Sequence, residues 1–258
     1  PYFGQTHLHS GWSFDEAIYN VTLGPDNAYR HARGEKVKHP AGFDVQLRIP
    51  LDFMIQSDHA EYLGVLVRMY NPDDPLSKHP LAAQVVGSGN DIAASTKAFY
   101  GLVSQTIQPD GSTKPDPTLN SPELKRTIWD QYIQIADSFN QPGKFTTLVA
   151  YEWSSQPNMS NLHRNVIYRD GKARADQVLP MTTFVSENPD DLLAWMASWD
   201  AQTGGRLLAI PHNGNLSNGR IFDLQTFKGS PITREWAEQR AKWEPLIEAS
   251  QHNGQSAA

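Results

Sequence analysis

The sequence predicts an α/β fold, in which helices alternate with the strands of a mostly parallel sheet or barrel. Apolar runs typical of buried strands lie at 45–49, 52–56, 145–150, 165–168, 206–210 and 246–249. Amphipathic segments with clear start and stop signals lie between several of these runs. Such alternation is typical of βα units, which bind their ligands at the carboxyl ends of the strands.

A chain of 258 residues suits one domain of this class. Residues 71–120 are rich in Pro, Asp, Gly and Ser, so we expect an insertion there. Within it a helix is predicted near 91–105, and the insertion should cover or flank the site.

Three further helices are predicted from their ends. Ser121-Pro122 supplies a cap and a helix-initiating proline, and Pro142-Gly143 stops that helix before the next strand. Asn188-Pro189 opens a second helix, which Gly204-Gly205 closes. The third helix spans about 233–242 and precedes the last apolar run.

Composition excludes several classes of function. The net charge is -6, and the Lys and Arg residues are scattered along the sequence. They therefore predict no basic patch that would bind nucleic acid or an anionic membrane. No run of about 18 apolar residues could span a membrane. The first residue is Pro1 rather than Met, which favours a processed periplasmic or secreted form over a cytoplasmic one. The sequence leaves the oligomeric state open.

Four short motifs carry the chemistry. Three of them follow an apolar run, so their imidazoles and carboxylates should converge at the strand ends and bind metal ions. Without cysteine, the ligands must come from His, Asp and Glu, which favours Zn, Mn or Fe. The motifs are Gln5-Thr6-His7-Leu8-His9-Ser10, Ser57-Asp58-His59-Ala60-Glu61, Tyr151-Glu152-Trp153-Ser154 and Ile210-Pro211-His212-Asn213.

The first two motifs each allow two interpretations. In an extended segment His7 and His9 point to the same side and can chelate one ion, although such pairs also occur on ordinary exposed strands. Asp58-His59 follows a buried strand and presents an acid and an imidazole. Asp58 could equally cap a helix that starts at Ala60.

The later motifs allow alternatives as well. Glu152 follows a strongly apolar run, where a carboxylate needs a cation, either a metal ion or an Arg. His212 lies at another strand exit. His163 on its own suggests a solvated loop residue, but the presence of the other motifs favours a role for it in the site. His252 stays undecided between a site residue and a surface residue.

These motifs, in this order, resemble those of the DUF3604 group of the PHP (polymerase and histidinol phosphatase) superfamily. The resemblance runs from Tyr2 to about Ser256 and adds Asp15 and the pair His163-Arg164 to the motifs above. It implies a distorted, TIM-barrel-like (β/α)7 barrel that holds two or three divalent metal ions and hydrolyses phosphoesters.

The resemblance also implies roles for individual residues. His7 and His9 correspond to ligands of the first metal, His163 and His212 to ligands of the second, and Glu152 to the bridging carboxylate. Asp15 and His59 fall where the third metal's ligands lie. Asp58 would orient His59 or a bound water without binding the metal itself.

One departure concerns the end of the barrel. No late Asp-x-His pair follows His212, although superfamily members carry one. Residues 247–256 resemble a family segment that further strands follow. We therefore expect a barrel that is incomplete at its C-terminus, with an exposed strand edge at 246–249 and weaker metal binding.

The predicted function is hydrolysis of phosphoesters, above all phosphomonoesters, as the small anionic substrates. Glu152, Asp58 and His59 are the expected catalytic residues, and Arg164, Asn213 and Asn215 are expected to bind the phosphoryl oxygens. The same site could cleave sulfate, phosphonate or amide bonds. Two alternatives are a non-catalytic metal-binding or ligand-binding module and a structural domain with incidental histidines.

Overall fold

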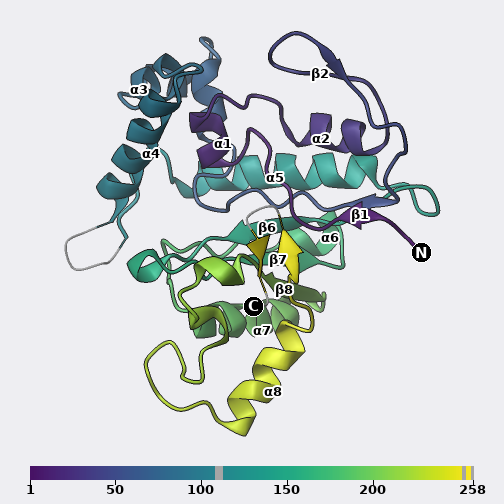
Figure 1. Ribbon diagram of the computed structural model, residues 1–258, viewed down its shortest axis with the longest axis vertical. Coiled ribbons are helices and arrows are strands. Elements are labelled where there is room, and N and C mark those ends of the chain that lie inside the picture. Colours follow the sequence, from purple (N-terminus) through teal and green to yellow (C-terminus); the bar gives the residue numbers. More distant parts are fainter. Residues whose placement is uncertain (108–112, 252–253, 257–258) are drawn as a thin grey trace.

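The computed structural model describes residues 1–107, 113–251 and 254–256 (Figure 1). His252 and part of the predicted insertion, residues 108–112, lie outside the described residues. No helix in the described ranges is both long enough and apolar enough to cross a membrane.

The described strands form small separate sheets rather than a closed barrel. One sheet is parallel and joins β1 (Gly4–Gln5), β4 (Phe53–Met54) and β5 (Thr146–Thr147). A second sheet is antiparallel and joins β6 (Ala150–Trp153), β7 (Arg164–Tyr168) and β8 (Leu207–Pro211). Two antiparallel pairs complete the set: β2 (Val37–Lys38) with β3 (Asp44–Val45), and β9 (Ser250–Gln251) with β10 (Gly254–Gln255).

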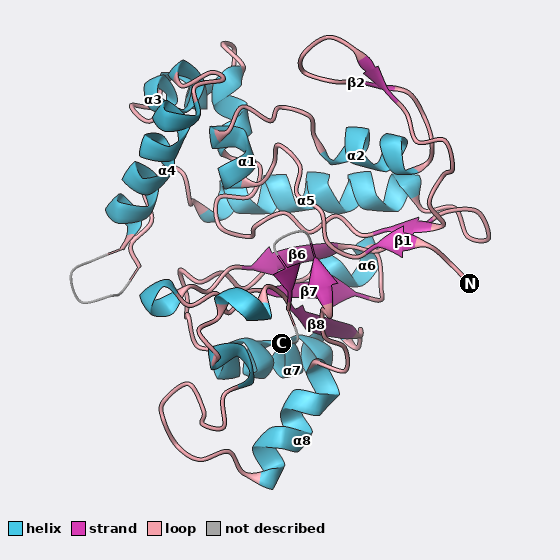
Figure 2. Cartoon of the chain, viewed as in Figure 1, coloured by secondary structure: helices cyan, strands magenta, loops and turns pink. Residues whose placement is uncertain are grey.

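The predicted (β/α)7 barrel is therefore wrong for the described chain. A parallel barrel needs a helical crossover after each strand. Here a connection without an α-helix reverses the chain between β6 and β7, so these strands pair antiparallel (Figure 2). The parallel strands β1, β4 and β5 are two residues each, too short for a barrel wall.

Only some of the predicted strands form. The runs at 165–168 and 206–210 become β7 and β8, but the runs at 45–49, 52–56 and 145–150 keep only short paired segments. Residues 246–249 form no strand, so the predicted exposed strand edge is wrong.

The helices begin where their capping residues predict. Ser121 Oγ accepts a hydrogen bond from Leu124 N (3.2 Å) at the start of α5 (Pro122–Phe139). Asn188 caps α7 (Pro189–Thr203), which ends at Gly204 in a left-handed conformation (φ 66°) that favours glycine. The predicted helices at 91–105 and 233–242 are α4 (Ile92–Thr106) and α8 (Arg234–Trp243).

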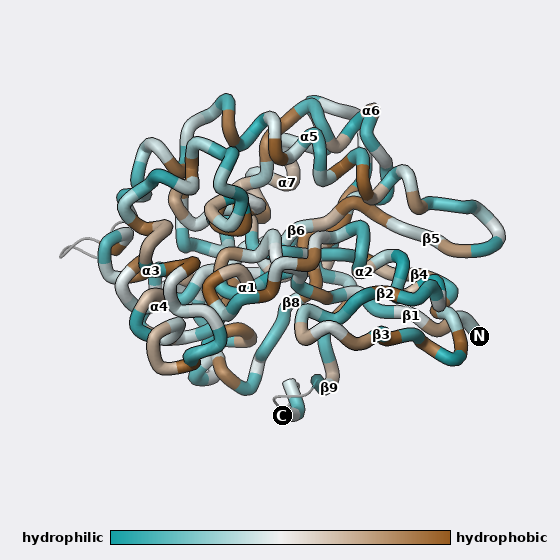
Figure 3. The backbone as a smooth tube through the Cα atoms, turned by 90° about the horizontal axis from the view of Figure 1, so that it is seen from above, coloured by the Kyte–Doolittle hydropathy of each residue, from teal (hydrophilic) through white to brown (hydrophobic). Residues whose placement is uncertain are grey.

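The remaining helices are short. The α-helices are α1 (Phe14–Ile18), α2 (Pro25–Ala32), α3 (Ala82–Gly87) and α6 (Lys172–Ala175). The 3-10 helices are η1 (Leu66–Tyr70), η2 (Pro75–Lys78), η3 (Pro157–Met159), η4 (Gly214–Leu216) and η5 (Arg220–Phe222). Hydrophobic and hydrophilic residues alternate along helices such as α4 and α5, as expected when one face meets the core (Figure 3).

The antiparallel sheet has two different faces, because side chains alternate along a strand. On one face Tyr151 and Tyr168 pack against Trp129 of α5 and Trp199 of α7 in the main hydrophobic core. The opposite face begins with a small apolar cluster of Ile55, Ala150, Ile167 and Ile210. Farther along this second face lies Glu152, which is completely buried.

Candidate metal centre

The second face of the antiparallel sheet collects polar side chains from three strands. Glu152 pairs in register with Asn165, two residues after His163, so alternation places all three side chains on the same face. His212 directly follows β8, and its backbone N–H donates to His163 O (3.0 Å). The ends of β6, β7 and β8 thus supply one side of the site.

The other side comes from the N-terminal half of the chain. His7 and His9 follow β1, and Asp15 lies in the first turn of α1. His59 follows β4 and forms an isolated parallel bridge with Glu152. This bridge links the end of the parallel sheet to the antiparallel sheet at the site itself.

Glu152 lies at the centre of four imidazoles. Its Oε2 is 2.8 Å from His9 Nε2 and 3.4 Å from His7 Nε2. Its Oε1 is 3.5 Å from His59 Nδ1 and contacts His163 Nδ1. The carboxylate of Glu152 therefore lies within 3.5 Å of a ring nitrogen of each of these four histidines.

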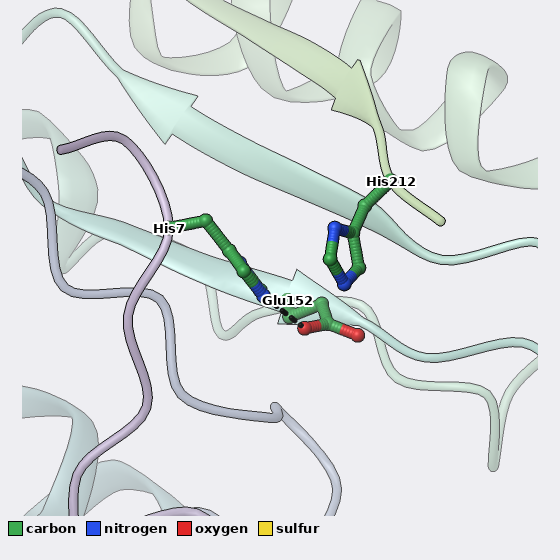
Figure 4. A group of neighbouring side chains, drawn as sticks. All are labelled: His7, Glu152 and His212. Atoms are coloured by element: carbon green, nitrogen blue, oxygen red, sulfur yellow. Dashed lines mark ion pairs between the residues drawn. The ribbon is translucent and has the colours of Figure 1, made fainter. Parts of the chain in front are cut away.

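His212 joins the cluster through the ring of His7. The centroids of these two rings lie 4.0 Å apart. Figure 4 shows His7 and His212 pointing toward Glu152 from different segments. Ligand atoms lie within 4.8 Å of one another in two groups that share Glu152: His7, Glu152 and His212, and His9, His59 and Glu152.

Hydrogen bonds fix which ring nitrogens face the cluster. His7 Nδ1 is 2.7 Å from Asn165 Oδ1 and 2.9 Å from Ser57 Oγ, so its Nε2 is turned toward Glu152. His9 Nδ1 is 3.0 Å from Ser13 Oγ, with the same consequence. Partners behind a ring set its tautomer and orientation, as around metal-binding histidines.

His212 and His163 have contrasting partners. His212 Nδ1 lies 3.0 Å from Glu248 Oε1, which leaves Nε2 beside the Asn213 amide at 2.8 Å. His163 Nε2 is buried and has no hydrogen-bond partner in the described part of the chain. A buried polar atom without a partner is rare, and a bound ion or water is one explanation for it.

The electrostatics of the cluster keep its carboxylates ionised. Burial favours protonation of Glu152, but His59 and His163 outweigh burial and hold its pKa well below the usual value. His59 and His9 likewise hold the pKa of Asp15 below its usual value against the effect of burial. An ionised carboxylate is the form that binds a cation.

The pKa values of His7 and His9 are shifted in opposite directions. Burial lowers the pKa of His7 to about 3, so its ring is neutral and ready to bind a metal. Burial acts in the same direction on His9, but Asp15 and Glu152 outweigh it and raise the pKa of His9 well above 6.5. A metal ion that binds His9 must therefore displace a proton.

Asp58 does not reach the cluster. Its buried carboxylate accepts hydrogen bonds from Ser10 Oγ (3.0 Å), Gln56 Nε2 (3.1 Å) and the Tyr132 hydroxyl (2.9 Å). Asp58 also accepts from the backbone N–H of Ser10, so it anchors the segment that carries His9. The structure gives it neither the expected catalytic position nor a helix cap at Ala60, since residues 60–65 form no α-helix.

Arg164 points away from the cluster. As the strand neighbour of Asn165 it lies on the opposite face, where its Nε donates to Glu244 Oε1 (3.0 Å). Its guanidinium also lies over the Trp153 ring, 6.0 Å from the ring centroid. The buried ion pair with Glu244 therefore leaves Arg164 no route to a substrate at the cluster.

The two predicted asparagines occupy different positions. Asn213 lines the cavity beside His212 and contacts Gln251 through its Oδ1. Asn215 is exposed in η4 and lies outside the cavity lining. Of this pair, the structure brings only Asn213 to the site.

Two residues of the site were not predicted from the sequence. Asn165 lies two positions after His163, so strand alternation could have placed it at the site. Glu248 is a carboxylate inside the apolar run 246–249, the same signal that identified Glu152. It binds His212 Nδ1, the backbone N–H of Asn213 (2.9 Å) and Ser256 Oγ (2.6 Å).

The residues of the cluster line a cavity of about 1050 Å³. Among the described residues that line this cavity there is no Lys and no Arg. An anionic ligand there would meet the carboxylates of Asp15, Glu16, Glu152 and Glu248, which no Lys or Arg of the described lining offsets. Bound cations would make this cavity more attractive to an anion.

Comparisons with known proteins give one match. The model of a family described as "Protein of unknown function (DUF3604)" matches residues 1–258. Neither the curated proteins nor the solved structures contain a match to this chain.

Proposed function

The chain belongs to the DUF3604 family, whose function is unknown, and for this member we propose metal-dependent hydrolysis of phosphoesters, above all phosphomonoesters. The observation that carries the proposal is the buried carboxylate of Glu152 shared by two groups of potential metal ligands. Two metal ions held by a shared carboxylate are typical of enzymes that cleave phosphoesters.

The donor set suits borderline divalent metals. Imidazole nitrogen and carboxylate oxygen are ligands of Zn, Mn and Fe, and no thiolate competes because the chain has no cysteine. His7 and His212 would hold one ion, and His9 and His59 the other, with Glu152 common to both. Asp15, 3.4 Å from His59 Nε2, would be a further ligand of the ion held by His9 and His59.

When bound, such ions polarise phosphoryl oxygens and lower the pKa of water toward neutrality. The chain's own residues then hold the geometry. Asn165, Ser13 and Glu248 fix the rings of His7, His9 and His212. We assign the Asn213 amide, at the cavity wall beside His212, the role of donating to a non-bridging oxygen of the substrate.

The reaction that fits the site is addition of water to phosphorus. The P–O bond to the leaving group breaks, and the leaving group departs as an alcohol with a proton from that water. Because the cavity lining has no Lys or Arg among the described residues, the metal ions would supply most of the positive charge that binds the phosphate.

We also place the chain in the PHP superfamily. Support comes from the order of its ligand motifs along the sequence and from their convergence in space.

Metal analysis combined with one assay tests the proposed function. The purified protein should contain Zn, Mn or Fe and should hydrolyse 4-nitrophenyl phosphate. Chelation should abolish turnover, and adding back one of the three metals should restore it. Metal content without turnover on any phosphate ester would reject hydrolysis and favour a metal-binding module, and a protein that binds no metal would reject both.

A further inference from the structure

A second cavity, of about 280 Å³, opens beside the metal centre. Asp15, His59 and His163 line both this cavity and the larger one, so the two spaces meet at the cluster. A ligand with one end at the metal centre can therefore place its other end in the smaller cavity. Its volume is close to the lower end of the roughly 300 to 1000 Å³ of small-molecule pockets.

Aromatic rings form the wall of this smaller cavity. Phe14 stacks on Phe99 of α4 with ring centroids 5.8 Å apart, and it also lies 5.0 Å from the ring of His59. Tyr62 lies 5.0 Å from Phe184 in an edge-to-face arrangement. These rings come from four segments and give the cavity an apolar lining that suits a carbon body.

Glu61 adds a negative charge to this apolar lining. Its side chain is buried, with 5 % exposure, and its Oε1 accepts from Thr183 N (2.7 Å) and Thr183 Oγ1 (3.0 Å). Its Oε2 is buried and has no hydrogen-bond partner among the described residues. A carboxylate oxygen left without a donor in such a place is costly, and a ligand that donates to it removes that cost.

Carboxylates dominate the charged side chains around the cavity. Glu187 is half-buried in the lining, and no Lys or Arg occurs among the described residues that line the cavity. Carboxylates next to aromatic faces attract organic cations, because both the ring faces and the carboxylates present negative potential. An anionic group would meet repulsion in the same place.

We propose that this cavity, the amine pocket, binds the leaving group of the substrate, and that this group has an aromatic or branched apolar body with a protonated amine. The ammonium donates to Glu61 Oε2, and the body packs on Phe14, Phe99 and Phe184. The reaction assigned to this leaving group rests on the proposed phosphoesterase function, whereas binding of the free amine does not.

The binding test uses three phenols and the metal-free, chelator-treated protein, so it does not depend on catalysis. Tyramine carries the ammonium, tyrosol is its neutral counterpart, and 3-(4-hydroxyphenyl)propanoate is its anionic counterpart. Titration calorimetry should show tyramine binding about tenfold more tightly than tyrosol, because hydrogen bonds to charged groups are the strong ones. The propanoate should bind most weakly.

Two variants locate the effect in the amine pocket. Glu61→Gln keeps the acceptor for Thr183 but removes the charge, so the preference for tyramine over tyrosol should disappear. Phe99→Ala should weaken all three ligands together. Glu238→Gln, at an exposed position on α8, is the matched control and should keep the preference.

The phosphate esters of the same three phenols connect the pocket to the reaction. The ester of tyramine should have the highest kcat/KM, and Glu61→Gln should reduce its advantage over the ester of tyrosol. If tyramine binds no better than tyrosol, or if Glu61→Gln keeps the preference, the amine pocket is refuted whatever the hydrolysis assay shows. Selective tyramine binding without hydrolysis of any ester supports the pocket and refutes the proposed function.

Discussion

Replacing Glu152 with Gln tests the central feature of the site. Glutamine keeps the shape of the side chain but removes its charge. In the structure Oε2 lies 2.8 Å from His9 Nε2 and 3.4 Å from His7 Nε2, while Oε1 contacts His163 and lies 3.5 Å from His59 Nδ1. A single substitution therefore alters both groups of potential ligands.

The expected loss is large because the charge is completely buried. Removing one partner from a buried set of charges costs about 3 to 5 kcal/mol. Since each 1.4 kcal/mol changes an equilibrium constant about tenfold, Glu152→Gln should weaken metal binding by about 10²-fold to 10⁴-fold. His163→Asn removes a ring but leaves Glu152 in place, so we expect a smaller loss of about 10-fold to 100-fold.

The assay compares four proteins: the unaltered chain, Glu152→Gln, His163→Asn and the control Glu238→Gln, whose Glu is exposed. Metal content after desalting, calorimetric titration with Zn or Mn and turnover of 4-nitrophenyl phosphate are measured for each. Circular dichroism confirms that the variants are folded. Unchanged metal content and turnover in Glu152→Gln, or a greater loss in His163→Asn, would refute a shared carboxylate.

Three further predictions address the surroundings of the cluster. Glu248→Ala removes the acceptor of His212 Nδ1 and should weaken metal binding about 10-fold to 100-fold in calorimetric titration; unchanged affinity would contradict its role behind the ring. Glu244→Gln leaves the Arg164 guanidinium buried without its partner carboxylate and should lower the free energy of unfolding by about 3 to 5 kcal/mol and Tm by about 10 °C, while metal content stays unchanged. Burial raises the pKa of Glu244, but the Arg164 guanidinium outweighs burial, so the net pKa of Glu244 is lowered. The stabilisation from this ion pair is therefore present above the unfolded pKa of the carboxyl group and is lost as pH falls through the lowered value. Denaturation of Glu244→Gln should depend less on pH in that acidic range than denaturation of the unaltered chain. The pKa of His9 is raised above 6.5, so its proton must leave on metal binding, and the affinity should rise at least about tenfold per pH unit until pH passes that raised value. A flat profile from pH 6.5 upward would show that His9 is not a ligand.

Local signals in the sequence determined the four longest α-helices and most of the candidate ligand residues. Ser121 and Asn188 cap α5 and α7 as predicted, because a capping side chain binds backbone groups two or three residues away in the same chain. His59, Glu152 and His212 were recognised from their positions after short apolar runs, and His7 and His9 from their spacing of two residues in an extended segment.

Strand direction was decided only by the tertiary structure. An apolar run predicts that a segment is buried, but it carries no information about which segment lies beside it or in which direction. The reversal between β6 and β7 produced an antiparallel sheet, and the predicted parallel barrel failed for that reason.

The same non-local pairing decided the roles of individual residues. Asn165 faces His7 and Arg164 faces Glu244, although the two are neighbours in the sequence, because alternation along β7 sends them to opposite faces. The return of residues 246–249 to the site, where Glu248 reaches His212, joins positions 36 apart. Such contacts depend on how the whole chain packs, and no short stretch of sequence encodes them.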